Sequence, residues 1–90
     1  MLEQAITLTF PAGYRMSDLK NEIQSAKTTL STNLRRIRKS KSLAQERLAL
    51  EAGVDRTVVS KIERQVANPS LEIIVRLAVT LDVQVAELLG

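Results

Sequence analysis

Apolar side chains recur every three or four residues along most of this 90-residue chain, which is the spacing of amphipathic helices. An early helical segment begins at Ser17 and either ends near residue 26 or continues to residue 39. From residue 31 the pattern is sharper and predicts a helix that ends near residue 41. Four more predicted helices follow, over residues 43–52, 56–64, 71–81 and 85–89.

The inward faces of these helices define the expected hydrophobic core. The core must be aliphatic, because aromatic residues make up only 2% of the chain. Its predicted members are Leu30, Leu34, Ile37, Leu48, Ala49, Ala52, Val59, Ile62, Leu71, Ile74, Leu77, Ala78 and Leu81.

Residue types at the expected helix ends support these boundaries. Ser42 and Gln45 fit a Ser-x-x-Gln capping box, which would begin the second helix. Gly53 follows that helix at a point where a tight turn needs a positive φ. Asp55 and Ser70 are the expected N-caps of the next two helices.

The N-terminal residues have a different pattern. Residues 4–10 alternate apolar and polar side chains, as a β-strand does, and Pro11 and Gly13 end the run. A single strand has no pairing partner within this chain. Residues 4–10 are therefore expected either to be disordered or to pair with a second copy, and Met16 is an alternative start of the protein.

The composition narrows the classes of function. The chain has no Cys and no His, so it lacks the commonest metal ligands and the usual general base. Its two aromatic residues cannot supply the base-stacking surface of many RNA-binding sheets. We therefore expect no enzyme, no metal, no cofactor and no small-molecule ligand.

Basic residues are concentrated in the middle of the chain. The formal net charge is +3, but residues 35–64 contain nine Lys and Arg against four Asp and Glu, an excess of five. Such an excess is attracted to a phosphate backbone. No apolar run approaches the roughly 20 residues of a membrane span, and the N-terminus does not read as a secretory signal, so a cytoplasmic protein is expected.

The stretch from residue 45 to residue 63 has the parts of a helix-turn-helix. A helix is followed by a Gly turn and by a second, capped helix. Ala49 is small enough for a close crossing, and Val54 and Val59 would hold the second helix against the first. The exposed face of that second helix then carries Arg56, Thr57, Ser60, Lys61 and Arg64.

Residues 34–89 resemble the Xre-type helix-turn-helix domain of phage repressors, plasmid regulators and restriction–modification controller proteins. The resemblance implies an all-α, five-helix, lambda-repressor-like domain over residues 31–90, with residues 1–30 as an N-terminal extension. Two positions depart from the family pattern, Gln65 in place of Gly and Gln84 in place of a Ser cap. The residues that carry the resemblance are Ile-Arg at 37–38, Leu-Ala-Gln-Glu-Arg-Leu-Ala at 43–49, Gly-Val at 53–54, Val-Ser-Lys-Ile-Glu-Arg at 59–64, Asn-Pro-Ser-Leu at 68–71 and the Leu-x-Val corner at 81–83.

This fold places the second motif helix in the major groove of double-stranded DNA. Arg56 is the first candidate for base reading, because a guanidinium binds guanine O6 and N7 together. Thr57 and Lys61 are further base-reading candidates. Candidates for the DNA backbone are Gln45, Ser60, Arg64, Asn68, Arg35 and Lys41, of which Gln45 and Asn68 are assigned by the resemblance.

The resemblance assigns a structural role to Arg38 and Glu63. In the family these positions form a partly buried ion pair that joins the first and third helices of the domain. The pair is therefore expected to stabilise the fold and not to read DNA.

A homodimer is expected, because a dimer reads two half-sites with matching two-fold symmetry. Apolar side chains that the core does not need lie between residues 71 and 89. The predicted dimer interface consists of Ile73, Val75, Val79, Val85 and Leu89.

Two functions remain open from the sequence. The first is a transcriptional regulator that binds an inverted-repeat operator, either a restriction–modification controller or a phage-type repressor. The alternative is an antitoxin that binds a toxin through a disordered N-terminal extension and autoregulates its operon. The extension would serve as a dimer contact in the first case or as the site of a protein partner in the second.

Overall fold

The computed structural model describes residues 11–90, which form five α-helices and no strand. This confirms the predicted all-α, five-helix fold. The strand expected at residues 4–10 lies outside the described residues. The helices are α2 (Met16–Ser40), α3 (Gln45–Ala52), α4 (Arg56–Glu63), α5 (Leu71–Leu81) and α6 (Val85–Leu89).

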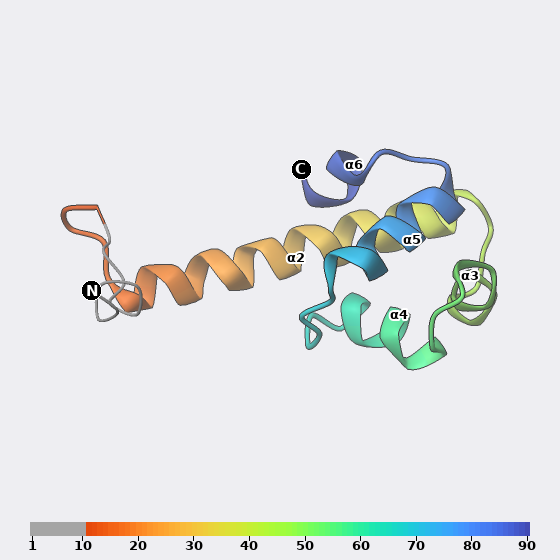
Figure 1. Ribbon diagram of the computed structural model, residues 1–90, viewed down its shortest axis with the longest axis horizontal. Coiled ribbons are helices and arrows are strands. Elements are labelled where there is room, and N and C mark those ends of the chain that lie inside the picture. Colours follow the sequence, from red (N-terminus) through yellow and green to blue (C-terminus); the bar gives the residue numbers. More distant parts are fainter. Residues whose placement is uncertain (1–10) are drawn as a thin grey trace.

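Helix α2 dominates the shape of the molecule. It has 25 residues, and at 1.5 Å per residue it is about 37 Å long. The molecule measures 48 × 24 × 22 Å, and α3 to α6 gather around the C-terminal half of α2 while its N-terminal half extends away from them (Figure 1). Of the two alternatives for this segment, the continuous helix is therefore the correct one.

The start of α2 differs from the expected cap. Ser17 lies inside the first turn, so it is not the N-cap. The backbone N–H of Arg15 instead donates to the Asp18 carboxylate at 2.6 Å, and this acidic side chain also suits the positive end of the helix dipole.

The core lies where the C-terminal half of α2 meets the four shorter helices. Helix α2 packs against α4 and α6, and α5 packs against α3 and α6. All but one of the predicted core residues are buried, and Leu88 joins them. The exception is Leu71, which is 67% exposed because it is the first residue of α5 and points away from the neighbouring helices.

The connections between helices use several left-handed residues. Gly53 has φ +70° at the end of α3, as predicted. Gln65 has φ +65°, and its side-chain oxygen accepts hydrogen bonds from Gln24 and Thr28 of α2. These bonds offset part of the cost of a left-handed non-glycine residue.

The predicted capping box at the start of α3 is wrong. Ser42 has φ +58° in the turn before the helix, and Ala44 is the N-cap of α3. The other two predicted caps are confirmed, since Asp55 accepts from the Thr57 N–H and Ser70 accepts from the Ile73 N–H.

Over residues 11–90 no helix is both long and apolar enough to cross a membrane. The same part of the chain contains no group of acidic side chains that could hold a metal ion.

Candidate nucleic-acid interface

Helices α3 and α4 form the helix-turn-helix that the sequence predicts. Ala49 is buried where α3 meets the rest of the body, and Val59 and Ile62 are the buried apolar side chains of α4. Gly53 allows the chain to reverse between them, because its positive φ is unfavourable for a residue with a Cβ atom. The turn and the two apolar contacts thus set the direction in which α4 presents its other face.

The N-terminus of α4 is held by Asp55. Its carboxylate accepts hydrogen bonds from both the backbone N–H and the hydroxyl of Thr57, each at 2.8 Å. These two bonds favour the ionised form and lower the pKa of Asp55 below its ordinary value. Because the Thr57 hydroxyl already donates its proton to Asp55, only its oxygen lone pair and the Thr57 methyl group are available to a ligand.

The outer face of α4 carries the side chains that the sequence assigned to DNA. Arg56, Thr57, Lys61 and Arg64 are exposed, and Ser60 is half-buried. The Arg64 Nε donates to the Ser60 hydroxyl at 3.2 Å. Two cations at positions 56 and 61 are thus free of any ion pair within the described residues, because no salt bridge involves them.

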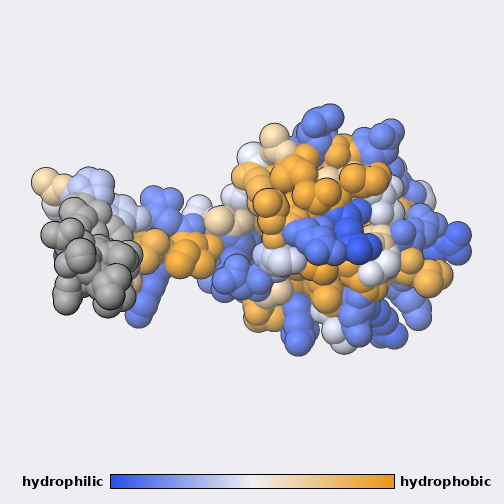
Figure 2. All heavy atoms as spheres, in the orientation of Figure 1, coloured by the Kyte–Doolittle hydropathy of each residue, from blue (hydrophilic) through white to orange (hydrophobic). Residues whose placement is uncertain are grey.

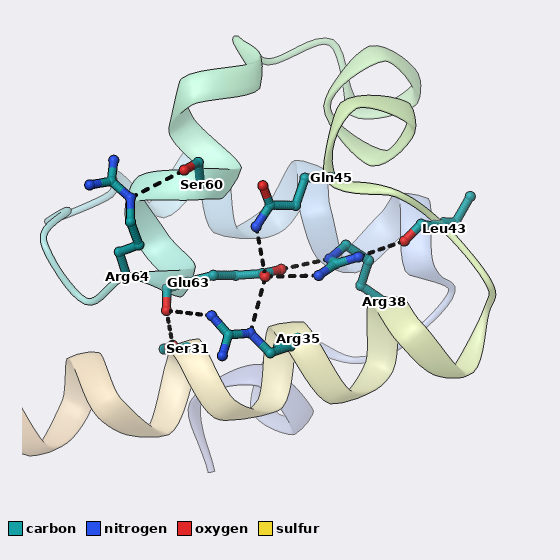
Figure 3. A network of polar contacts seen from close by, with 8 residues as sticks. All are labelled: Ser31, Arg35, Arg38, Leu43, Gln45, Ser60, Glu63 and Arg64. Atoms are coloured by element: carbon teal, nitrogen blue, oxygen red, sulfur yellow. Dashed lines mark hydrogen bonds and ion pairs between the residues drawn. The ribbon is translucent and has the colours of Figure 1, made fainter.

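A buried carboxylate lies at the opposite face of α4. Glu63 is 2% exposed, and the Arg38 guanidinium of α2 donates two hydrogen bonds to its carboxylate, at 2.7 and 2.9 Å (Figure 3). Arg38 also donates to the backbone carbonyl of Leu43 at 2.7 Å. The ion pair expected between Arg38 and Glu63 is therefore present, and it joins α2, the turn before α3, and α4.

Two further side chains complete this network. Gln45 donates to the Glu63 carboxylate at 3.0 Å, and Arg35 lies 3.3 Å from it (Figure 3). The backbone carbonyl of Glu63 accepts from Ser31 at 2.6 Å and from Arg35 at 3.1 Å. Every buried side-chain polar atom of the described residues has a hydrogen-bond partner, so the network is closed.

The network changes the protonation of its members. Burial opposes ionisation of Glu63, but the hydrogen bonds from Arg38 and Gln45 and the charge of Arg38 outweigh it and hold the pKa of Glu63 below its ordinary value. The hydrogen bond to Glu63 correspondingly raises the pKa of Arg38. Both groups are therefore charged at neutral pH.

The predicted backbone candidates are not all in one place. The Gln45 amide N–H and the Arg35 guanidinium point into the Glu63 network, whereas Lys41 is exposed at the end of α2. Asn68 lies in the loop before α5, where it borders a hollow beside α2. The candidates on α4 thus share one helix, whereas Asn68 belongs to the loop between α4 and α5.

Sequence reasoning missed Ser31 and the inward direction of Gln45 and Arg35. A signal for Ser31 was present, because it follows Leu30 on the side of α2 that faces the core, where a polar residue needs a hydrogen-bond partner. The identity of that partner, a carbonyl 32 residues away, depends on how α2 and α4 cross and has no local signal.

The five residues predicted for self-association are unequally exposed. Val75, Val79 and Leu89 are exposed, whereas Ile73 and Val85 are half-buried and pack against the core. Val79 is the most open, at 73% exposure. Figure 2 shows a broad hydrophobic area over α5 and α6, interrupted by hydrophilic side chains.

A family model described as helix-turn-helix matches residues 34–88, from the last turns of α2 into α6. The chain is also 39% identical over 82 residues to a hypothetical transcription factor of Neisseria meningitidis. That alignment covers 91% of this chain and 72% of the Neisseria protein.

Two solved structures have the same arrangement of helices. The restriction-modification controller protein C.AhdI from Aeromonas hydrophila superposes with a TM-score of 0.68 at 39% identity, over 71% of this chain and 97% of that protein. The hypothetical transcription factor NHTF from Neisseria superposes with a TM-score of 0.72 at 36% identity, over 93% of this chain and 90% of that protein. The second likeness extends well into the N-terminal half of α2.

Proposed function

The chain belongs to the Xre-type helix-turn-helix family and is a DNA-binding transcription regulator, and from this premise we propose that it acts as a homodimer on an inverted-repeat operator. Helix α4 enters the major groove and reads base edges, with Arg56 as the principal base-reading residue and Thr57 and Lys61 beside it. The observation that carries this proposal is the outer face of α4, where two unpaired cations stand next to a rigidly capped N-terminus.

The contacts of α4 support different roles for its two faces, with the inner face packed against the protein and the outer face open to DNA. The inner face is held by Val59, Ile62 and the buried Glu63 network, so it is not available to a ligand. The outer face is free, and Ser60 and Arg64 continue it toward the phosphate backbone. A helix with a fixed inner face presents its outer side chains in a defined register, which base reading requires.

The remaining candidates for contacts with the DNA backbone lie on α2, on α3 and in the loops. Lys41 is exposed and Asn68 lies in an exposed loop, so both can reach a phosphate. Gln45 and Arg35 donate to Glu63, so in this proposal they chiefly hold the inner face of α4 in place. They contact phosphate only through those N–H groups that do not donate to Glu63.

The regulator is proposed to be of the restriction–modification controller type or of the phage-repressor type. The likeness to C.AhdI over nearly the whole length of that protein supports the first. The antitoxin alternative expected a disordered N-terminal extension, whereas residues 16–30 form the first half of a continuous helix. A protein that regulates transcription in this way would work in the cytoplasm.

Selection of binding sites from random duplex DNA tests the base-reading role. Wild-type protein should recover an inverted repeat, and Arg56→Ala should recover the same repeat with one guanine position in each half-site relaxed. The lost discrimination should be about 1–3 kcal/mol. The salt concentration must be held constant, because affinity for DNA depends steeply on it.

A matched control is Arg47→Ala. Arg47 is an exposed Arg on α3, so its removal changes the net charge equally, and its Nε is paired with Glu51 at 2.6 Å. It should weaken binding without relaxing any single base. If wild-type protein enriches no sequence, or if both variants relax the same position, base reading by Arg56 is wrong.

A further inference from the structure

An apolar stripe runs along the half of α2 that extends from the body. Its members are Met16, Leu19, Ile23, Ala26 and Leu30, at intervals of three, four, three and four residues. These intervals are the a and d positions of two heptads, the pattern by which helices pair along a seam. Met16 and Ile23 are 48% and 45% exposed, Ala26 is exposed and Leu19 is half-buried, whereas Leu30 is buried where the stripe meets the core. The chain's own core therefore leaves the stripe uncovered on the N-terminal side of Leu30.

The stripe leads into a hollow where α2 enters the body. The hollow has a volume of about 230 Å³. One wall is formed by Ile23, Ala26 and Leu30 from the stripe together with Lys27, and the other is formed by Asn68, Pro69, Ile74 and Leu89. Apolar side chains thus continue from the extended part of α2 into the body (Figure 2).

We propose that this stripe, defined by residues 16, 19, 23, 26 and 30, is the contact surface for the same stripe of a second copy of this chain. The two α2 helices run antiparallel, and the N-terminal turns of each α2 lie in the hollow of the other copy. The inference rests on the proposed homodimer and adds to it a contact outside the α5–α6 surface.

The direction of pairing follows from the shape of the molecule. Residues 23–30 of α2 already face the wall formed by Pro69, Ile74 and Leu89, so a parallel pairing, which would set the whole of this segment beside its own copy, would bring the two bodies into collision. The N-terminal turns around Met16 and Leu19 lie outside the body and can enter the hollow (Figure 1). With Ile23 opposite Ala26 of the second copy, Leu19 lies opposite Leu30.

A second copy fits the stripe better than an unrelated partner does. A heptad stripe is complementary to itself, and a two-fold contact of this kind closes without leaving free sites. Two heptads alone form only a marginal helix pair. Leu89 belongs both to the hollow and to the predicted dimer interface, so the two surfaces are continuous and can bury area together.

The charges beside the seam predict how salt affects the contact. Lys20 and Lys27 flank the stripe, and the antiparallel register brings Lys20 of one copy near Lys27 of the other. Salt screens such exposed like charges. Self-association should therefore strengthen as salt rises, whereas binding to DNA weakens.

Cysteine cross-linking tests the contact directly, because the natural chain has no Cys. An equimolar mixture of Ile23→Cys and Ala26→Cys, one of them carrying a mass tag, should give a covalent heterodimer on mild oxidation. Leu19→Cys alone should not cross-link, because its two copies would be offset by about 16 Å along the seam, beyond disulfide reach. Asn21→Cys mixed with Ala26→Cys is the matched control from the opposite face of α2.

The outcomes separate the inference from the proposal on which it rests. No heterodimer from the Ile23 and Ala26 variants, or as much from the Asn21 control, overturns the stripe contact. Cross-linking of Leu19→Cys with itself overturns the antiparallel direction. If wild-type protein is a monomer in sedimentation at tens of micromolar, the homodimer itself is wrong.

Sedimentation of charged variants gives an independent measure. Ile23→Asp should raise the dimer dissociation constant at least about tenfold, because it places a charge in an apolar seam. Asn21→Asp, two residues away, should change it little. Both sites are exposed, so circular dichroism should show folded protein in each case. A dimer unaffected by Ile23→Asp leaves the α5–α6 surface as the interface and overturns the role of the stripe.

Discussion

Glu63 is the residue on which most of the polar interior depends. It is buried, yet its carboxylate is matched by Arg38, Gln45 and Arg35, and its carbonyl by Ser31 and Arg35. A carboxylate in such a place is tolerated only because nearby donors replace the water it has lost. The same contacts tie α4 to α2, so this residue links the stability of the fold to the position of the proposed base-reading helix.

Replacing Glu63 with Gln should destabilise the protein by about 3–5 kcal/mol, because the nearly buried Arg38 would lose its countercharge. The free energy of unfolding is measured by urea denaturation followed by circular dichroism. Glu51→Gln is the control, since it breaks the exposed pair with Arg47 and should cost less than about 1 kcal/mol. An unchanged stability of Glu63→Gln would contradict the structural role of the pair.

Stability should also depend on pH through Glu63. The pKa of Glu63 is lowered in the folded protein, so its contribution is complete above the unfolded value of about 4.3 and is lost as pH falls through the lower folded value. Urea denaturation at pH 7 and at acidic pH should show a smaller loss for Glu63→Gln than for the wild type. Equal losses in both proteins would mean that Glu63 does not titrate as described. Asp55, whose pKa is also lowered, leaves some pH dependence in the variant.

At the scale of the elements, the turn between α3 and α4 sets the orientation of the two helices relative to each other. Gly53 ends α3 in the left-handed region, and the N–H of Val54 donates to the Ala49 carbonyl at 3.0 Å, which closes the end of the helix. Asp55 then caps α4 from outside. Three consecutive residues therefore end one helix, reverse the chain and begin the next.

Gly53→Ala should destabilise the protein by about 1–2 kcal/mol, since a Cβ atom is disfavoured at positive φ. That Cβ would also lie 3.2 Å from the Arg76 guanidinium, which now donates to the Ala52 carbonyl. Thermal unfolding measures the loss. Leu50→Ala, on the exposed face of the same helix, should have a much smaller effect, and equal melting temperatures for wild type and Gly53→Ala would contradict the argument.

At the scale of the whole molecule, the proposed base-reading and self-association surfaces lie on different helices, and Asn68, a proposed DNA backbone contact that also lines the hollow, lies where the two come close. The outer face of α4 carries the proposed DNA contacts, and the α5–α6 surface and the α2 stripe carry the proposed contacts with a second copy. A two-fold dimer doubles the DNA contacts and relates the half-sites by the symmetry of the operator. Loss of the dimer should therefore weaken operator binding without changing which bases each half-site prefers.

Val79→Asp tests the α5–α6 surface. Val79 is highly exposed, so the change should leave the fold intact, weaken the dimer in sedimentation and lower the affinity for the full inverted repeat more than for a single half-site. Leu50→Asp is the matched control, because Leu50 is 72% exposed on α3, outside both proposed self-association surfaces. Equal dimer strength in the two variants would exclude Val79 from the interface.

The sequence by itself determined the features that depend on near neighbours. Helical spacing located α3 to α6 to within two residues of their observed bounds, and the caps at Asp55 and Ser70 and the turn at Gly53 follow from side chains next to the groups they satisfy. The outward face of α4 follows from the same spacing, because Val59 and Ile62 must face inward. These are local properties of backbone and side chain, so one segment suffices to predict them.

Only the tertiary structure decided which distant groups meet. From its neighbours in the sequence, Gln45 fits a capping box. In the structure, however, the packing of α2, α3 and α4 places the Glu63 carboxylate next to Gln45, and the Gln45 side-chain amide donates to that carboxylate. Leu71 has an apolar side chain in the right period, yet no neighbouring helix covers the first turn of α5. The structure likewise decided that α2 is continuous, which places the apolar side chains of an undecided segment along one extended helix, and Thr28 of that helix donates to Gln65 from the loop after α4. Such pairings depend on how the helices are placed in space, and periodicity along the chain does not encode that placement.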